Sequence, residues 1–227
     1  MAVTTGDDGG SQRGGAATAL AAPRSTYRHG DLRRALIEAG IDLARAGGPE
    51  AVVLREATRR AGVVPNAAYR HFAGRQELLE EVRAAALSAL AVAMETELAA
   101  LPDGMWPTEQ ARASLRAVGA GYLRFALTEI GLFRTAFAAS PDPQGDADPA
   151  KAGNSGLNPF QLLSAALDRM VEAGVLPPDR RPGAEYLAWS AVHGLAMLVI
   201  DGPLRGRDPA QLDAIGQRVV EMVENGL

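Results

Sequence analysis

One short stretch restricts the fold of this chain more than any other part of the sequence. Residues 54–78, LREATRRAGVVPNAAYRHFAGRQEL, predict a helix, a corner at Gly62-Val63-Val64, and a second short helix that begins at Pro65. Glycine at the end of a helix accommodates a left-handed backbone. Proline suits the first helical turn because the amide hydrogen that it lacks has no partner there. Two short helices joined by a tight glycine-containing turn form a helix-turn-helix unit.

Helical periodicity continues on both sides of this unit, and we find no alternating run long enough to predict a sheet. A first helix is expected from about residue 27 or 30 to residue 46, with Leu32, Leu36, Ala39 and Leu43 on one face. A long alanine- and leucine-rich helix should cover residues 76–100. Further helices are expected over 107–128, 130–139, 158–174, 183–201 and 209–225. The predicted fold class is therefore all-α.

The pattern predicts three segments with different roles. Residues 1–25 are mostly Gly, Ala, Thr and Ser, a composition typical of a disordered tail. Residues 26–75 should form a three-helix domain that contains the helix-turn-helix unit, and residues 76–227 a larger helical domain. Within the latter, residues 140–157 (SPDPQGDADPAKAGNSGL) are polar and rich in Pro and Gly, so we expect a mobile loop.

Composition excludes several classes of site. The chain has 227 residues and no cysteine, which excludes disulfides and thiolate metal sites and fits the reducing cytoplasm. Its longest apolar run, around residues 195–200, is too short to cross a membrane, and the N-terminus lacks the pattern of a secretion signal. The three histidines, His29, His71 and His193, are dispersed, so we predict neither a metal site nor a cofactor.

The distribution of charge matters more than its total. The net charge is −4, yet residues 24–75 hold ten arginines and five acidic residues, a local charge of +5, which leaves −9 for the remainder. A basic module attached to an acidic body is typical of a chain in which one part contacts the phosphates of a nucleic acid.

Two parts of the sequence resemble a known family. HGDLRRALIEAGIDLARAGG (residues 29–48) and LREATRRAGVVPNAAYRHFAGRQELL (residues 54–79) resemble the N-terminal domain of the tetracycline-repressor (TetR) family of bacterial regulators. The pattern Trp-x-x-x-His-Gly at residues 189–194 resembles the signature of a subgroup of its C-terminal domains. The resemblance implies an N-terminal DNA-binding domain, a helical effector-binding domain and a homodimer built on the last two helices.

In this family the second helix of the pair docks in the major groove of double-stranded DNA. Carried over by position, the resemblance assigns Tyr69, His71 and Arg75 to phosphates, and Asn66 either to an adenine edge or to local capping of the backbone. Val64 departs from the family, which favours Ser or Thr at the cap of this helix. The full predicted DNA-binding set is Arg55, Asn66, Ala67, Tyr69, Arg70, His71 and Arg75.

A small, largely apolar effector is expected among aromatic residues of the second domain. Gly119 and Gly121 interrupt a good helix and indicate a close helix approach, a bend or space for a ligand. His193 is either a satisfied histidine in the core or interface, or the polar group of the pocket. The predicted pocket residues are Tyr122, Phe125, Phe133, Phe137, Phe160, Leu163, Met170, Trp189 and His193.

The last two predicted helices carry apolar residues at spacings of three and four, which predicts a helix-packed homodimer. The residues expected in the dimer interface are Ala188, Ala191, Leu195, Leu212, Ile215, Val219 and Met222.

The leading hypothesis is a ligand-responsive repressor that binds a pseudo-palindromic operator as a homodimer. An enzyme that uses His193 with Glu185 or Asp201 is a weaker alternative, because no nucleophile motif, phosphate loop or paired carboxylates are found. A helical small-molecule-binding or adaptor protein without specific DNA binding is the third, and only Val64 favours it.

Overall fold

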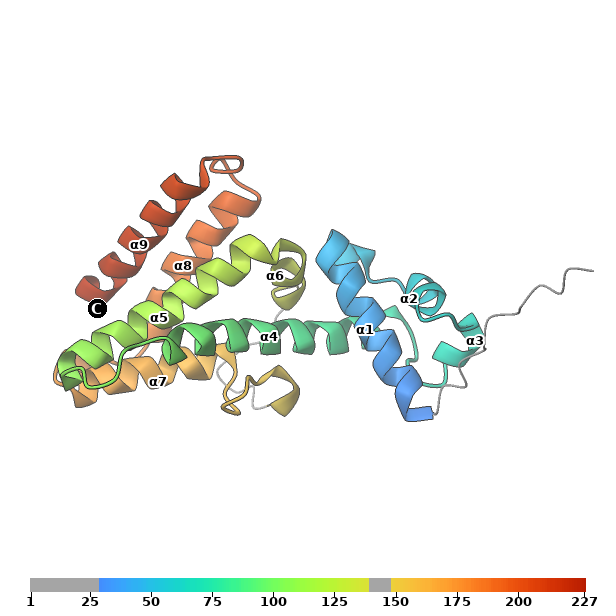
Figure 1. Cartoon of the computed structure of the whole chain (residues 1–227), viewed down its shortest axis with the longest axis horizontal. Helices are drawn as coiled ribbons and strands as arrows, with labels where there is room; N and C mark the ends of the chain where they lie inside the picture. Colours follow the sequence, from blue (N-terminus) through green and yellow to red (C-terminus); the bar gives the residue numbers. More distant parts are fainter. Residues whose placement is uncertain (1–28, 139–147) are drawn as a thin grey trace, which may run out of the picture.

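The computed structural model describes residues 29–138 and 148–227, and its regular elements in these ranges are all helical, as predicted. Figure 1 shows α1, α2 and α3 gathered at one end, here called the head, and α5 to α9 forming the body. The long helix α4 runs from the head into the body. The predicted tail, residues 1–25, lies outside the described ranges. In chain order the elements are α1 (His29–Gly47), η1 (Pro49–Ala51), α2 (Leu54–Arg60), α3 (Pro65–Ala68), α4 (Arg75–Ala99), α5 (Pro107–Thr128), α6 (Ile130–Ala136), η3 (Pro149–Lys151), α7 (Pro159–Glu172), η4 (Pro178–Arg180), α8 (Ala184–Ile200) and α9 (Pro209–Gly226).

The head encloses an apolar core that the first turns of α4 complete. Leu36 of α1 and Leu78 of α4 are fully buried, and Phe72, which follows α3, is 1% exposed. The guanidinium of Arg33 lies over the Phe72 ring, 5.3 Å from its centroid, and so adds a cation–π contact. The predicted apolar face of the first helix is confirmed, because Leu36, Ala39 and Leu43 are all buried.

The corner between α2 and α3 has the geometry that its sequence predicts. Gly62 adopts a φ of +69°, a left-handed backbone that L side chains rarely adopt. The amide of Val63 donates to the carbonyl of Thr58 and that of Gly62 to the carbonyl of Arg59, which is the Schellman pattern of a helix end. Pro65 then starts α3. The glycine therefore ends one helix and the proline starts the next within three residues.

The second helix of the pair is shorter than predicted. Its regular part ends at Ala68, whereas we expected helix to residue 72. The amides of His71 and Phe72 both donate to the carbonyl of Ala68, at 2.9 Å each, so the chain tightens into a turn. This turn directs Phe72 into the head core.

Helices α4 and α5 pack closely because of a glycine. A Cβ atom at Gly121 would lie 2.6 Å from the Cα of Met94 and 2.8 Å from the carbonyl oxygen of Ala93. Of the explanations left open by the sequence, a close helix approach holds at Gly121. Gly119 differs, since a Cβ there would meet only side chains, the nearest at 3.0 Å being Val220 of α9.

Residues 148–158, here called the strap, form an ordered segment along α4. We predicted a mobile loop over residues 140–157, and this prediction is wrong for residues 148–157; residues 139–147 lie outside the described ranges. The carboxylate of Glu95 accepts hydrogen bonds from the backbone amides of Asn154 and Ser155, at 2.8 Å each, and from the Ser155 hydroxyl at 2.5 Å. Partial burial opposes ionisation, but these bonds outweigh it and lower the pKa of Glu95.

Candidate nucleic-acid interface and ligand cavity

The outer surface of the helix-turn-helix pair presents polar and aromatic side chains. Asn66, Tyr69 and Arg70 follow one another at spacings of three and four residues, and all three are exposed, Tyr69 by 61%. Ala67 and His71 are half-buried, and Arg55 on α2 is exposed. The structure thus brings most of the predicted DNA-binding residues to the surface of the head.

Arg75, the remaining member of that set, is engaged inside the head. Its Nε donates to the carbonyl of Val52 at 2.9 Å and its Nη2 to the carbonyl of Pro49 at 2.7 Å. Glu50 lies 3.3 Å from the same nitrogen. The guanidinium therefore ties the start of α4 to η1 and the residue that follows it, a structural role that the sequence did not suggest.

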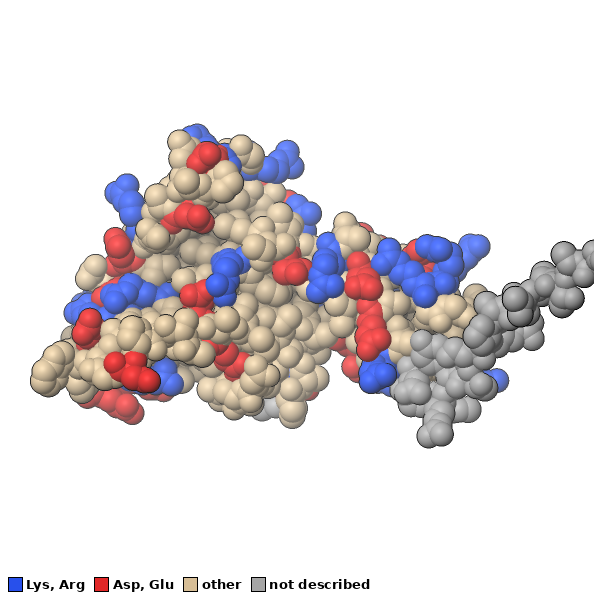
Figure 2. Space-filling view, viewed as in Figure 1, with Lys and Arg blue, Asp and Glu red and all other residues tan. Residues whose placement is uncertain are grey.

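Lys and Arg side chains gather over the part of the head where α2 lies (Figure 2). Not all of this charge faces solvent alone. Arg59 donates two hydrogen bonds to Glu56, at 2.9 and 2.6 Å, and Arg60 lies 3.7 Å from the same carboxylate. The hydrogen bond from Arg59 holds the pKa of Glu56 below its usual range, so the carboxylate is ionised at neutral pH.

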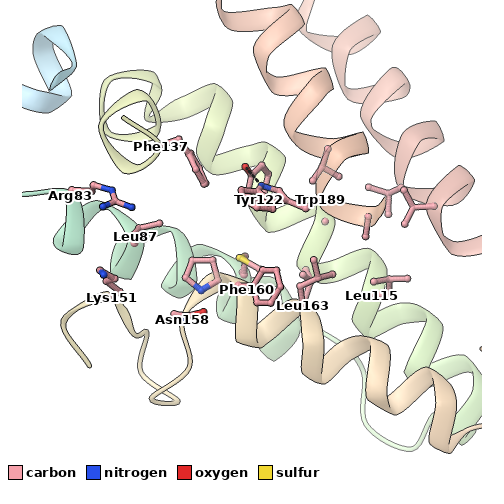
Figure 3. A pocket seen from close by; sticks show the side chains of 18 residues that line it. Arg83, Leu87, Leu115, Tyr122, Phe137, Lys151, Asn158, Phe160, Leu163 and Trp189 are labelled. Carbon is pink, nitrogen blue, oxygen red and sulfur yellow. Dashed lines mark hydrogen bonds between the residues drawn. The ribbon is translucent and has the colours of Figure 1, made fainter. Parts of the chain in front are cut away.

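A narrow, mostly apolar cavity of about 90 Å³ lies in the body (Figure 3). Helices α4, α5, α7, α8 and α9 and the strap all contribute to its wall. The lining residues are Arg83, Leu87, Met94, Leu115, Val118, Gly119, Tyr122, Phe137, Lys151, Asn158, Pro159, Phe160, Leu163, Ala188, Trp189, Val192, Val220 and Val223.

The cavity is built only partly from the residues that the sequence indicated. Five of the predicted residues line it, namely Tyr122, Phe137, Phe160, Leu163 and Trp189. The other four lie outside this lining: Phe125, Phe133 and Met170 are buried in the core, and His193 is half-buried behind Tyr122. Sequence reasoning missed Arg83, Lys151 and the two valines of α9. Lys151 had one signal, as the single lysine of the chain.

The Trp-x-x-x-His pattern of α8 forms a hydrogen-bonded group with α5. The Nε1 of Trp189 donates to the Tyr122 hydroxyl at 3.1 Å, and the same hydroxyl lies 2.7 Å from the Nδ1 of His193. Burial lowers the pKa of His193, so the ring is neutral at pH 7, and burial raises the pKa of the Tyr122 phenol. Of the two interpretations left open, His193 fits the satisfied histidine, because its described partner is a core tyrosine.

The carboxylates named in the enzyme alternative have other partners. Glu185 accepts a hydrogen bond from Ser164 at 2.9 Å and pairs with Arg181 at 2.8 Å, while Asp201 pairs with Arg134. Within residues 29–138 and 148–227, no group of His, Cys, Asp and Glu side chains could hold a metal ion. The same ranges contain no helix that is long and apolar enough to cross a membrane.

Helix α6 joins the cavity to the head. A Cβ atom at Gly131 would lie 2.2 Å from the carbonyl oxygen of Ala44 and 2.5 Å from that of Arg45, so α6 touches the backbone at the end of α1. Arg45 also pairs with Glu129, at 2.9 Å, just before α6. At the other end of α6, Phe137 lines the cavity and packs 6.0 Å from the Tyr122 ring.

The outer faces of α8 and α9 expose large apolar side chains. Leu187 is 65% exposed, Leu198 45% and Met222 60%. The predicted interface residues divide: Ala188 and Leu195 are buried within the protomer, and Leu212 faces a groove between α5 and α9. Ala191, Ile215 and Val219 are half-buried. Part of the apolar stripe therefore faces the body's own core.

Comparison with known proteins matches both parts of the chain. Residues 36–82 match the family model described as "Bacterial regulatory proteins, tetR family". Residues 115–223 match the model described as "Tetracyclin repressor-like, C-terminal domain". A comparison with curated proteins found no match.

Solved structures share the fold over most of the chain. A protein of unknown function from Rhodococcus sp. RHA1 is 24% identical, with a TM-score of 0.69 over 90% of this chain and 99% of that one. The TetR family regulator PfmR from Thermus thermophilus is 22% identical, with a TM-score of 0.53 over 86% and 95%. A TetR variant from Acinetobacter baumannii AYE, solved in complex with minocycline, is 17% identical, with a TM-score of 0.57 over 84% and 93%.

The helix-turn-helix head and the two family matches define a DNA-binding transcription regulator rather than an enzyme. The chain belongs to the TetR family.

Proposed function

We propose that this regulator is a ligand-responsive repressor that binds a pseudo-palindromic operator as a homodimer, in the cytoplasm. The observation that carries the proposal is the path from the apolar cavity to the head, formed by α4 and by α6. We propose residues 26–75 as the DNA-binding domain and residues 76–227 as the effector-binding and dimerisation domain. Leu78 and Val82 of α4 pack beneath Gly40 of α1, so α4 belongs to the core of both.

The exposed residues of the second helix are proposed to read DNA. Asn66 has the donor and acceptor that pair with an adenine edge, and Arg70 can contact a guanine edge or a phosphate. Tyr69 and His71 are proposed to contact phosphates. Arg75 is proposed to act mainly by fixing the orientation of the head on α4, since at least two of its donors are bonded to backbone carbonyls.

The homodimer is proposed to form through the outer faces of α8 and α9. Leu187, Leu198 and Met222 supply apolar area there, and Ala191 allows the helices to approach closely. A twofold axis through this face would place the two reading helices about 34 Å apart, on successive turns of the major groove.

An effector in the cavity is proposed to change the distance between the two heads. Phe137 borders the cavity at one end of α6, and Gly131 touches α1 at the other. A ligand that displaces Phe137 would therefore move the contact that holds the head. Such a ligand releases DNA only if it binds better to the head spacing that DNA does not accept.

Replacing Arg70 with alanine should weaken DNA binding without unfolding the protein. The matched control is Arg169→Ala, because both arginines are exposed on short helices or turns but Arg169 lies on α7 in the body. With a labelled fragment from upstream of the gene, Arg70→Ala should lower affinity about tenfold or more. If Arg70 binds phosphate, the slope of log affinity against log salt should become less negative by about 0.9.

Failure of the wild-type protein to retain this fragment at low salt would contradict the proposed function. It would favour a helical binding or adaptor protein without specific DNA binding, the alternative to which Val64 pointed. Equal losses in Arg70→Ala and Arg169→Ala would indicate non-specific attraction rather than a reading surface.

Replacing Leu198 with aspartate should convert the proposed dimer into a monomer, because each copy would bury a charge in an apolar interface. The control is Trp106→Ser, which removes an aromatic side chain that is 78% exposed at the start of α5. Light scattering coupled to size-exclusion chromatography should report a dimer for the wild type and the control. A monomeric wild type, or a dimeric Leu198→Asp, would rule out this interface.

A further inference from the structure

The cavity is long and thin. It extends along α4 from Arg83 to Met94, which is eleven residues or about 16 Å of helix axis at the usual rise. Its volume is only about 90 Å³. A space with this length and volume accommodates an extended chain better than a fused-ring molecule. The wall along it is made of aliphatic and aromatic side chains, including Val118, Phe160 and Leu163.

Positive charge is confined to one end of this space. Among the described residues that line the cavity, the charged ones are Arg83 and Lys151. Figure 3 shows the two side chains on either side of Leu87, with Phe160, Leu163 and Leu115 lying successively farther from them. The cavity is therefore apolar along its length and cationic at its head-proximal end.

The other polar groups of the wall already have partners. The Tyr122 hydroxyl and the Trp189 indole bond one another, and the side-chain oxygen of Asn158 caps α7 by accepting from the amide of Gln161 at 2.9 Å. These groups add little to ligand selection. The charged pair is thus the part of the wall that can distinguish one apolar ligand from another.

The described charges at this end sum to +1. The Nε of Arg83 donates to the carbonyl of Ala136 at 3.0 Å, which leaves its positive charge in place. Asp148 lies 3.6 Å from the Lys151 amine and supplies one negative charge. The Lys151 side chain is only 15% exposed, so an anion beside it would compensate for the water that burial removes.

The strap holds Lys151 in place. The hydroxyl of Ser88 on α4 donates to the carbonyl of Ala152 at 2.6 Å, directly after the lysine. Glu95 fixes the following turn, and a Cβ atom at Gly153 would lie 2.6 Å from that carboxylate. Lys151 is therefore presented to the cavity by an ordered backbone, which reduces the entropy lost when an anion binds.

We propose that the effector is a linear-chain carboxylate, with its carboxylate between Arg83 and Lys151 and its hydrocarbon chain along α4 towards Met94. This inference rests on the proposed function, which assigns the cavity to an effector. The carboxylate would accept charge-assisted hydrogen bonds from both cations, and the chain would bury its methylene groups against the apolar wall.

Isothermal titration calorimetry with the full chain tests the ligand class directly. Decanoate, decanol and decylamine share one chain length and differ in the charge of the head group, and each is used below its aggregation concentration. Decanoate should bind about tenfold or more tightly than decanol, as expected for charge-assisted hydrogen bonds, and decylamine should bind most weakly. Equal affinities for decanoate and decanol would overturn the proposal.

Two variants locate the carboxylate. Lys151→Gln and Arg83→Gln should each weaken decanoate binding about tenfold and leave decanol binding unchanged, whereas Lys151→Arg should retain decanoate binding. Undiminished decanoate binding by Lys151→Gln would overturn the proposed position. Because the decanol titration is made on the same variants, a loss caused by misfolding is recognised when both ligands fail.

The single lysine provides a second readout. Reductive methylation followed by peptide mass spectrometry reports the reactivity of Lys151, since it is the only lysine in the chain. Decanoate should reduce this modification several-fold more than decanol does. Equal protection by both ligands would contradict a carboxylate at Lys151. DNA retention without ligand is measured separately, so failure of the regulator function and failure of the ligand class are distinguishable.

Discussion

Replacing Gly121 with alanine should destabilise the protein more than any other single methyl group added to α5. The new Cβ would lie 2.6 Å from the Cα of Met94 and 2.8 Å from the oxygen of Ala93, both backbone atoms of α4 that cannot rotate away. Helices α4 and α5 would have to separate along a buried interface. We expect a loss of about 1–3 kcal/mol in the free energy of unfolding, which the better helix propensity of alanine only partly offsets.

The matched control is Gly216→Ala on α9. A Cβ atom at this position would meet the Cδ1 of Leu123 at 3.4 Å, an ordinary contact with a side chain. This variant should be neutral or slightly stabilising, because alanine favours a helix by up to about 1 kcal/mol over glycine. Urea unfolding followed by circular dichroism compares the two. A Gly121→Ala variant as stable as Gly216→Ala would show that the α4–α5 packing is not as tight as described.

Replacing Gly131 with alanine should uncouple the head from the body. Its Cβ would lie 2.2 Å from the oxygen of Ala44 and 2.5 Å from that of Arg45, so α6 would have to withdraw from α1. In the proposed dimer, DNA binding depends on the spacing of two heads, and a loosened head would lower affinity. We expect DNA affinity to fall about tenfold or more, with helix content and dimerisation retained.

Two measurements check this prediction. Fluorescence anisotropy with the labelled upstream fragment gives the affinity, and hydrogen exchange should show faster exchange confined to the end of α1 and to α6. Gly226→Ala on α9 is the control, because no described atom lies within 4 Å of a Cβ built there. Unchanged DNA affinity in Gly131→Ala would mean that α4 alone connects the head to the body.

Local rules predicted the helix-turn-helix corner well, because they involve neighbours in the sequence. A left-handed glycine at Gly62, a proline at the first turn and an apolar Phe72 all follow from the residues themselves. The length of α3 was overestimated, since the turn that follows Ala68 depends on Phe72 entering a core formed by α1 and α4.

The cavity was predicted less completely, because its wall depends on contacts between distant residues. Lys151 joins it only because Glu95 and Ser88 of α4 bind a segment that composition marked as mobile. Arg75 was assigned to phosphate by position in the family pattern, whereas its actual hydrogen-bond partners lie more than twenty residues earlier in the chain. Such pairings follow from the tertiary fold and leave no local pattern in the sequence.

Helix α8 has two working faces on one rod. Trp189 and Val192 form part of the cavity wall, while Leu187 and Leu198 face outward on the surface that we assign to the dimer. In that dimer, the same helix of one copy would touch its own ligand on one side and the other copy on the opposite side. A shift of α8 on ligand binding would therefore change the shared interface, and the two cavities would bind their ligands cooperatively rather than independently.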